Sequence, residues 1–521
     1  MSQQGFTVGI DLGTTTSLVG VFRGGKPELI LDPNSTTRSP IVPSLVAMDS
    51  RGRLVVGERA RTLVNKGQGV REVKRKMETG EKVKLGDESY RPEEISALIL
   101  KHLKANAELY LNGPVTDVVL SVPALFTQTG IFNTKQAGEL AGLNVLHVMS
   151  EPTAAALAFG IDHMDVDEKI MVFDFGGGTL DISIVELVDG VIDVTSAFGD
   201  TTLGGKDFDE ALVELILAKF RAECGDDVEI TETAFHQLKS AAETCKIQLS
   251  SDDTGFVELL SFGLQDGFPV DLEVEVSRDE FNQETAHLLE RARTCVYKAL
   301  EPKNLRPEMI HRVLLVGGTT YIPAVREMLE EIFPSRVRAD VPPDLAVAMG
   351  TTIRSAMLTG QTDPSKDILI VDSWAHGLGV EVLTFRDNQP EKAYSPLMEP
   401  NTVIPYSVKR RYSLVHFEQN EVEVKVRQTT VRNAYFLEDT VDTGISGVIT
   451  DIPTSATGVP HDVEIEFSVN VDKLINLTAT IPATGQELKL EFNLTDLQLN
   501  TQEQVTAAKR RVDELWSKAR R

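Results

Sequence analysis

Residues Val172–Glu186, VFDFGGGTLDISIVE, are the stretch from which the fold of this chain is best inferred. The pattern predicts a buried strand that ends in Asp174, a tight turn of three glycines, and a second strand that returns antiparallel to the first. Because glycine has no Cβ, such a turn can take positive φ angles and expose adjacent N–H groups that bind anions, including polyphosphates. Asp174 and Asp181 flank the turn and are suited to hold hydrated magnesium beside a phosphate. An ordinary glycine hairpin is the alternative, because single motifs have little specificity.

The same pattern occurs at the start of the chain. Residues 6–31 predict three strands joined by two turns, and the first turn follows Asp11 and contains Gly13–Thr16. This repetition suggests a duplicated domain, with one copy beginning near residue 6 and the other near residue 169. A third turn, Gly317–Gly318, follows another apolar strand. Two related lobes whose turns converge on one cleft would bind a nucleotide from both sides.

Composition limits the classes of function. A length of 521 residues predicts two to four domains. The chain has 78 acidic and 52 basic side chains, a net charge of −26, so nucleic acid is a poor partner. Its three cysteines are widely spaced, which indicates neither a disulfide scaffold nor a zinc site. No signal peptide and no membrane span is evident, so we expect a cytoplasmic protein without membrane partners.

Nucleotide-binding motifs of other folds are missing from the sequence. Neither GxxxxGK[ST] nor GxGxxG occurs, which argues against P-loop and Rossmann folds. Motifs of a different family occur instead, in that family's order and spacing: GIDLGTTTS, VKR at 73–75, VLSVPALF, EPTAAALAFG, DFGGGTLDISIVE, GDTTLGGKDFD and LLVGGTTYIP. On these motifs the chain resembles the seventy-kilodalton heat-shock chaperones of the DnaK type and, more distantly, actin and the sugar kinases.

The resemblance is strong over residues 6–360 and weaker over 361–500. It implies an α/β fold, with an actin-like two-lobed ATPase domain followed by a β-sandwich and a short C-terminal helix. The implied boundaries are 1–362 for the ATPase domain, 363–372 for an interdomain linker, 373–498 for the β-sandwich substrate-binding domain and 499–521 for the helix.

The resemblance also assigns roles within the predicted cleft, where ATP and Mg²⁺ would bind and K⁺ is a further candidate ion. Asp11 and Asp174 would hold Mg²⁺ through water. The implied catalytic residues are Lys74, Glu151, Asp174, Thr179 and Asp181. The implied ATP-binding residues are Gly13, Thr14, Thr15, Gly176, Gly177, Gly178, Gly204, Gly205, Glu243, Lys246, Ser250, Gly317, Gly318, Thr319, Tyr321 and Asp344.

Several of these residues have a simpler interpretation. Lys74 lies in the run VKRKME, which is typical of a solvated basic segment. Glu151 precedes Pro152 at a predicted helix start, where it could act only as a cap. Glu243 and Lys246, on one helical face with Ser250, could be an exposed face with an i,i+3 ion pair.

The sequence departs from the family pattern at three positions. Tyr321 replaces an arginine that would stack on adenine, and a phenol ring can stack as well. Ile131 replaces an arginine eight residues after Pro123, and isoleucine cannot make the charge-assisted hydrogen bonds by which that pair transmits the presence of ATP to the substrate domain. His147 replaces an arginine that faces the J-domain partner. We therefore expect weakened or rewired coupling between hydrolysis and peptide release.

The remainder of the chain predicts a linker and a β domain. Ile368–Asp372 follows a polar hinge and is either the interdomain linker, which docks on the ATPase in the family, or the first strand of the next domain. Short alternating segments then predict antiparallel strands: GLGVEVL, YSLVHFE, EVEVKVRQ, VEIEFSVN, INLTATI and ELKLEFNL. The implied peptide-binding residues are Val380, Val382, Leu383, Tyr412, Val415, Val422 and Val424, although each could equally belong to the sandwich core.

The C-terminal segment predicts an amphipathic helix. Val505, Ala508, Val512 and Leu515 form one apolar stripe. We expect the family's long helical lid to be missing here, which implies fast peptide exchange.

The leading hypothesis is an ATP-dependent chaperone that binds exposed apolar segments of unfolded polypeptides, with a J-domain co-chaperone and a nucleotide exchange factor as partners. An adaptor or exchange-factor-like homologue, whose ATPase only sets conformation, is the second hypothesis, favoured by Ile131 and His147. A sugar kinase is the third, and the linker and β domain count against it.

Overall fold

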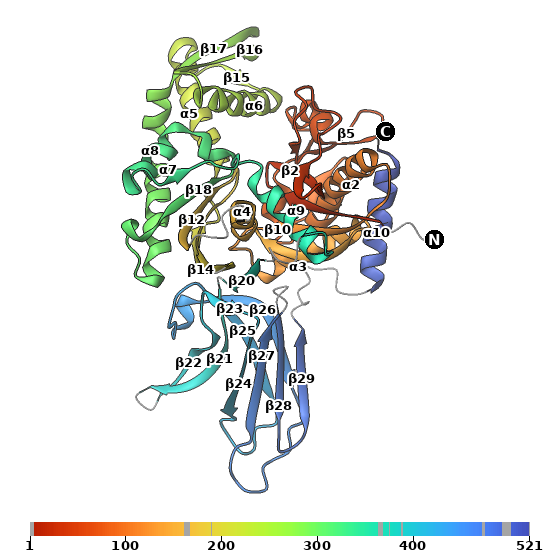
Figure 1. The fold of residues 1–521 in the computed structure, drawn as a ribbon, viewed down its shortest axis with the longest axis vertical. Coiled ribbons are helices and arrows are strands. Elements are labelled where there is room, and N and C mark those ends of the chain that lie inside the picture. Colours follow the sequence, from red (N-terminus) through yellow and green to blue (C-terminus); the bar gives the residue numbers. More distant parts are fainter. Residues whose placement is uncertain are drawn as a thin grey trace.

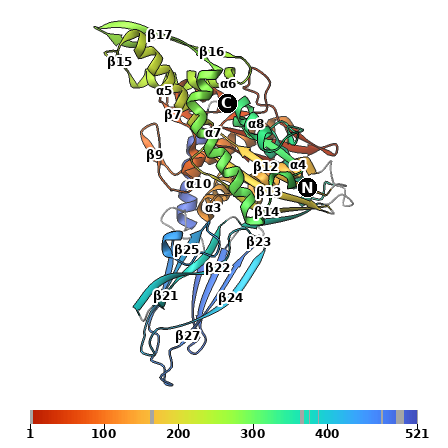
Figure 2. The same cartoon turned by 90° about the vertical axis from the view of Figure 1, so that its left-hand side faces the viewer.

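The computed structural model describes residues 5–160, 167–188, 190–362, 368–374, 376–386, 389–470, 475–491 and 502–519. We call residues 5–160 the first α/β unit, 167–362 the second α/β unit and 376–491 the β part. Figures 1 and 2 show the β part extending from one end of the α/β units, with the β16–β17 hairpin at the opposite end. No helix in the ranges given above is long and apolar enough to cross a membrane.

The two α/β units contain sheets with the same strand order. The six-stranded sheet is ordered β11-β10-β1-β2-β3, with the short strand β4 also paired to β2, and the seven-stranded sheet begins β19-β18-β12-β13-β14. In each unit three consecutive strands form an antiparallel meander, and the first of them pairs in parallel with a later strand. The internal repeat predicted from the glycine turns is therefore confirmed in the topology.

The predicted strands around both glycine turns are also present. The first sheet comprises β1 (Phe6–Leu12), β2 (Thr16–Arg23), β3 (Lys26–Leu29), β4 (Val42–Pro43), β10 (Val115–Val122) and β11 (Asn144–Ser150). The second comprises β12 (Glu168–Phe175), β13 (Leu180–Val188), β14 (Val191–Asp200), β18 (Arg312–Val316), β19 (Val337–Arg338), β20 (Leu369–Trp374) and β23 (Thr402–Ile404). Smaller strands are β5 (Val46–Met48), β6 (Leu54–Val56), β7 (Gly69–Val70), β8 (Val83–Leu85), β9 (Glu88–Tyr90), β15 (Glu229–Ile230), β16 (Thr254–Gln265) and β17 (Phe268–Ser277).

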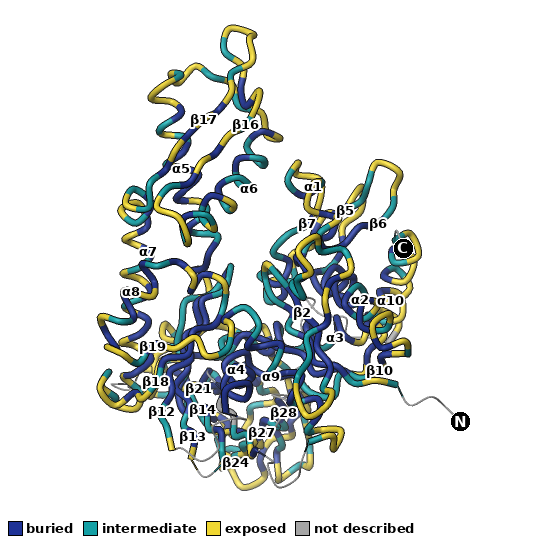
Figure 3. Tube along the Cα trace, turned by 45° about the horizontal axis from the view of Figure 1, so that its top comes forward, coloured by how far each residue is buried: buried dark blue, intermediate teal, exposed yellow. Residues whose placement is uncertain are grey.

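Helices cover these sheets. They are α1 (Arg61–Val64), α2 (Pro92–Leu111), α3 (Gln128–Leu140), α4 (Glu151–Gly160), α5 (Gly205–Cys224), α6 (Glu232–Leu249), α7 (Arg278–Leu300), α8 (Pro323–Ile332) and α9 (Ala346–Leu358). Figure 3 shows α4 and α9 as mostly buried segments between the two units.

The contact between α4 and α9 depends on glycine. A Cβ on Gly350 of α9 would lie 1.8 Å from the carbonyl oxygen of Ala154 in α4. On the neighbouring strand, a Cβ on Gly9 would lie 2.2 Å from the backbone nitrogen of Thr352. Backbone therefore packs directly on backbone where the two units meet.

We predict that Gly350→Ala lowers the free energy of unfolding by about 1–3 kcal/mol or more, because the added methyl group must displace α4. Gly160→Ala, at the end of α4, is the matched control: its Cβ would meet Ile192 at an ordinary 3.5 Å. Thermal unfolding of both variants tests this, and equal melting temperatures would contradict it.

The segment after the polar hinge joins the second sheet. Strand β20 pairs in parallel with β14, with Leu369 opposite Val191, and antiparallel with β23. The first described residues after the hinge are thus hydrogen-bonded both to the second unit and to a strand from the β part. Residues 363–367, the first half of the expected linker, lie outside the described residues.

The β part has two four-stranded sheets, ordered β22-β21-β25-β26 and β24-β27-β28-β29. Their bounds are β21 (Gly377–Arg386), β22 (Gln389–Met398), β24 (Tyr406–Ser413), β25 (Val422–Thr429), β26 (Val441–Ile449), β27 (Asp462–Val469), β28 (Ile475–Ile481) and β29 (Gln486–Glu491).

Two details of the predicted strands in the β part were wrong. The strand expected at residues 412–418 lies instead at Tyr406–Ser413, and neither β22 nor β26 was expected. The more polar strand β24 is paired with β27 along its whole length, and Lys409 and Arg411 both form ion pairs with Glu464 across the pair, at 2.6 and 2.7 Å. The partner Glu464 lies more than 50 positions later in the sequence. The alternation of residues within β24 therefore could not reveal this pairing.

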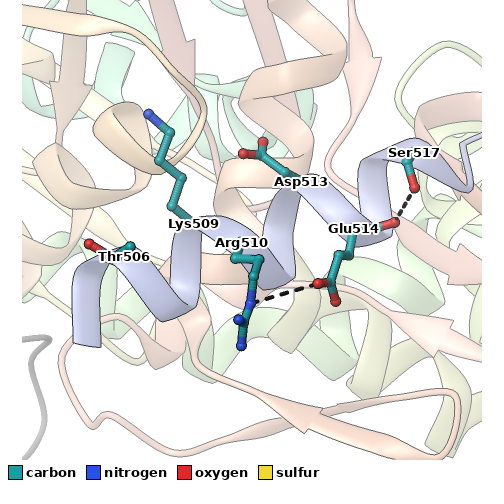
Figure 4. Close-up of a pocket in the computed structure, with 6 residues that line it drawn as sticks. All are labelled: Thr506, Lys509, Arg510, Asp513, Glu514 and Ser517. Atoms are coloured by element: carbon teal, nitrogen blue, oxygen red, sulfur yellow. Dashed lines mark hydrogen bonds and ion pairs between the residues drawn. The ribbon is translucent and has the colours of Figure 1, made fainter. Parts of the chain in front are cut away.

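The C-terminal helix α10 (Gln502–Ser517) packs on α2 and α3 of the first unit, beside the sheet rather than on the β part. Its predicted apolar stripe is confirmed as the buried side, with Ala508, Val512 and Leu515 at most 4% exposed. Figure 4 shows the polar side, where Arg510 pairs with Glu514.

Charged pairs border the apolar contact of α10. Arg511 lies 2.6 Å from the Glu94 carboxylate at the start of α2, and Asp513 lies 2.8 Å from Lys101. Glu93 is fully buried beside Glu94, and this burial raises the pKa of Glu93 to about 7. Because the folded state holds the Glu93 proton more tightly than the unfolded chain, stability is lost as pH rises from about 4.5 to about 7.

We predict that Glu93→Gln raises the free energy of unfolding at pH 8 by up to about 3 kcal/mol, and that this gain disappears near pH 4. Glu94→Gln is the control, because it removes the charged partner of Arg511 and should destabilise the protein at pH 8. Urea unfolding at both pH values checks the prediction. If Glu93→Gln is less stable than wild type at pH 8, the Glu93 carboxylate stabilises the folded protein at that pH and the prediction is wrong.

Candidate functional site

A cavity of about 1100 Å³ lies between the two α/β units. Its lining contains most of the residues predicted for the cleft: Asp11, Gly13, Thr14, Thr15, Lys74, Glu151, Asp174, Gly176, Gly177, Thr179, Gly205, Glu243, Lys246, Ser250, Gly317, Gly318, Thr319, Tyr321 and Asp344. The other predicted residues, Gly178, Gly204 and Asp181, are not in the lining but belong to the same turns and strand.

The glycine turns touch one another with no room for side chains. A Cβ on Gly177 would lie 2.1 Å from Thr15 Oγ1, and one on Gly204 would lie 2.4 Å from the nitrogen of Gly178. Thr319 Oγ1 donates a hydrogen bond to the carbonyl oxygen of Gly176 at 2.8 Å. The turns from both units therefore form one backbone-walled end of the cavity, as a phosphate cradle requires.

A buried ion pair lies beside this end. Lys74 is 3% exposed, and its Nζ lies 2.5 Å from Glu151 Oε1 at the start of α4. The interpretation of Lys74 as part of a solvated basic run was therefore wrong. Asp174 and Asp181 are buried as well, and the half-buried Asp11 accepts a hydrogen bond from Ser121 Oγ at 2.7 Å.

The pKa values show that this cluster lacks positive charge. Loss of water contact, and then the Glu151 carboxylate, raise the pKa of Asp11 to about 6 and that of Asp181 to about 7. The same two causes raise the pKa of Asp174 well above its usual value. Burial lowers the pKa of Lys74, but the Glu151 and Asp11 carboxylates outweigh this and raise it overall. The cluster is thus suited to an additional cation.

Comparison with known proteins identifies the fold family. The Hsp70 protein family matches this chain in two overlapping segments, residues 7–85 and 73–515. The chain is 38% identical over 480 residues to the chaperone protein DnaK of Mycoplasma mobile, an alignment that covers 92% of this chain and 77% of that protein.

The chain belongs to the Hsp70 family.

This homology supports a chaperone function, ATP binding and a role in protein folding and the stress response. Hsp70 proteins are ATPases that normally bind ATP with Mg²⁺.

The donor set at the cluster fits a magnesium ion held largely through water. Asp181 Oδ1 is buried and has no hydrogen-bond partner among the residues that the structure describes. No group of three or more His, Cys, Asp or Glu side chains within those residues is placed to hold a metal directly. Mg²⁺ retains most of its water shell and often binds through one or two carboxylates and substrate phosphates, so Asp11 and Asp174 are sufficient protein partners.

Helices α5 and α6 line the cavity on the side of the second unit. Lys246 lies 2.7 Å from Asp209 Oδ1 and donates to the carbonyl oxygen of Gly205 at 3.0 Å, so its ion-pair partner is Asp209 rather than the expected Glu243. Sequence reasoning missed Asp209, although it follows the Gly204–Gly205 turn by one helical turn. Burial raises the pKa of Asp209 to about 6.

Tyr321 and Asp344 form a hydrogen-bonded pair in the cavity wall. The Tyr321 hydroxyl donates to Asp344 Oδ1 at 3.0 Å, while the residue as a whole is 49% exposed. Burial, and then the Asp344 carboxylate, raise the pKa of this hydroxyl to about 12, so it stays protonated at neutral pH. The hydrogen bond fixes a neutral aromatic ring where the Hsp70 pattern has arginine.

The two other departures lie outside the cavity. Ile131 on α3 is 3% exposed and packs in the core of the first unit. His147 is half-buried in β11. Because this position is buried in the core, an apolar side chain such as that of Ile131 fits it.

The expected peptide-binding residues all lie in the β part but differ in burial. Val380 and Val424 are in its core, and Val382, Tyr412 and Val422 pack against that core while half-buried. Leu383 and Val415 are 47% and 44% exposed. The Tyr412 hydroxyl is 2.9 Å from Ser395 Oγ. A peptide-binding role for these residues stays a prediction.

We predict that Tyr321→Ala weakens ADP binding roughly tenfold, because loss of one aromatic platform under a base costs about 1–3 kcal/mol. Tyr321→Phe keeps the ring and loses only the bond to Asp344, so its affinity should stay within about threefold of wild type. Isothermal titration calorimetry measures both. An unchanged affinity in Tyr321→Ala would rule out stacking.

Proposed function

We propose that this chain is an ATP-dependent molecular chaperone: an actin-like two-lobed ATPase hydrolyses ATP slowly and thereby controls the affinity of a β-sandwich for extended apolar peptides. The observation that carries the proposal is the Lys74–Glu151 pair, buried among Asp11, Asp174 and Asp181 against the glycine turns. Such a combination of one lysine, several acids and exposed N–H groups suits phosphoryl transfer to water.

Each residue has a defined task in this proposal. Backbone N–H groups of the turns at Gly13–Thr15 and Gly176–Thr179 hold the β- and γ-phosphates. Lys74, oriented by Glu151, offsets charge that develops on the transferred phosphoryl group. Glu151 and Thr179 orient the attacking water, and the Thr179 hydroxyl is itself oriented by donating to Asp181 Oδ2 at 3.3 Å. Bound Mg²⁺ would supply Lewis-acid stabilisation of the phosphate charge.

Three contacts support communication between the cavity and the β part. Strand β20 extends the sheet that carries Asp174. Asn401 Oδ1 accepts a hydrogen bond from the Ala197 nitrogen of β14 at 3.0 Å. His376 Nε2 lies 2.9 Å from the carbonyl oxygen of Leu125, two residues after Pro123. We infer that coupling in this chain runs through these backbone-directed contacts, since Ile131 has no polar group to contribute.

The second candidate is an adaptor whose ATPase sets conformation with weak coupling to substrate, and the buried Ile131 favours it. In either case we propose a J-domain protein and a nucleotide exchange factor as partners and the cytoplasm as the location, as for a DnaK-type protein. A sugar kinase is disfavoured by the β part with its two four-stranded sheets.

We predict a slow basal ATPase rate that rises when an unfolded peptide and a J-domain protein are added. Lys74→Ala should lower the rate at least about 100-fold, because it removes the buried cation beside the phosphates. Lys76→Ala is the matched control, since this neighbouring lysine points to solvent and pairs with Glu81. Steady-state phosphate release measures all three proteins. A measurable rate that neither addition changes would support the adaptor instead.

A further inference from the structure

An ion pair joins the two α/β units across the cavity. Lys206 Nζ lies 3.4 Å from Glu72 Oε2, and both residues line the cavity. Glu72 belongs to the first unit and comes two residues before Lys74, whereas Lys206 belongs to α5 of the second unit and follows Gly205. We call this pair the Glu72–Lys206 bridge.

Two other lysines of the cavity wall, Lys74 and Lys246, are paired differently. Lys74 and its partner Glu151 both come from the first unit, and Lys246 and its partner Asp209 both come from the second. The Lys74–Glu151 pair therefore lies within the first unit, and the Lys246–Asp209 pair lies within the second. The Glu72–Lys206 bridge instead must break when the two sides separate.

Both members of the bridge occupy locally unfavourable positions. Glu72 has φ 55° and ψ 29°, the left-handed region that few residues other than glycine adopt. Lys206 lies in the first turn of α5, where the helix dipole favours anions over cations. Residues with a strained backbone are often found at functional sites. The ion pair across the cavity offsets part of these costs.

A second contact from the same segment crosses the cavity. The Arg75 guanidinium donates to the carbonyl oxygen of Gly178 in the glycine turn of the second unit. Residues 72–75 therefore reach the second unit at two points, with Lys74 between them. The backbone N–H of Lys206 also donates to the carbonyl oxygen of Gly177 at 3.0 Å, so the bridge lies beside the glycine turn of the second unit.

We propose that the Glu72–Lys206 bridge holds the two units together across the cavity and thereby slows the release of bound nucleotide. The identity of the ligand rests on the proposed function. The two side chains are 28% and 32% exposed, so the attraction is modest and is weakened by salt. A modest barrier is what a site that must release ADP in each cycle requires.

The test is the dissociation rate of a fluorescent ADP analogue from the full chain. Glu72→Gln and Lys206→Met should each speed release about two- to fivefold and reduce its dependence on ionic strength. The double charge reversal, Glu72→Lys with Lys206→Glu, should return release to within about twofold of wild type. Glu210→Gln is the matched control, because it removes the other acid near Lys206, at 3.9 Å and within α5, without affecting a contact between units.

The Glu72→Gln variant also separates this role from direct phosphate binding by Lys206. If Lys206 bound phosphate and Glu72 competed for it, loss of the Glu72 charge would free the lysine and slow release. Slower release in Glu72→Gln, or release at the wild-type rate in both single variants, would overturn the proposal.

Hydrogen exchange of the nucleotide-free chain over residues 57–80 and 201–210 distinguishes failure of the bridge from failure of the proposed function. Faster exchange in both single variants, with wild-type exchange in Glu210→Gln, supports the bridge even if no nucleotide binds, in which case only the proposed function fails. Normal ADP binding with unchanged exchange and release overturns the bridge and leaves the function intact.

Discussion

The grouping of four carboxyl groups around one lysine is the constraint on which the rest of this structure depends. Removing a carboxylate from water is costly unless it is paired, and among the residues that the structure describes Lys74 forms its one close ion pair with Glu151. The raised pKa values of Asp11, Asp174 and Asp181 express that cost. A bound cation would offset the excess negative charge of these carboxylates, and a phosphate would bind beside it. We therefore expect ligand binding to stabilise the folded protein.

The fold assembles this cluster from two copies of one topology. Each sheet brings a strand with aspartate as its last residue but one to the same place, and each following glycine turn has backbone N–H groups available for a ligand. Neither copy forms the cavity alone, because Lys74 and Asp11 come from one unit and Asp174 from the other. Close backbone contact at Gly350 and Ala154 fixes the base of the cleft, which leaves its opening to weaker contacts such as the Glu72–Lys206 bridge.

Local pattern was sufficient to predict the strands and turn of Val172–Glu186, because alternation, aspartate and glycine act within a few residues. It could not predict the burial of Lys74, which depends on Glu151, 77 positions away. The displaced strand β24 likewise depends on Glu464 of a later strand. The apolar stripe of α10 correctly indicated one buried side, but the surface that covers it is set by α2, far away in sequence.

The positions at which this chain departs from the Hsp70 pattern are not among the residues proposed to hydrolyse the phosphate bond of ATP. Tyr321 replaces a cation by a neutral ring at the base end, and Ile131 places an apolar side chain in the core of the first unit. Glu72 and Lys206 add an attraction that opening must overcome. We propose that these features act on how long nucleotide stays bound and how its presence is transmitted, whereas Lys74, Glu151 and Asp174 line the cavity where the proposed chemistry takes place.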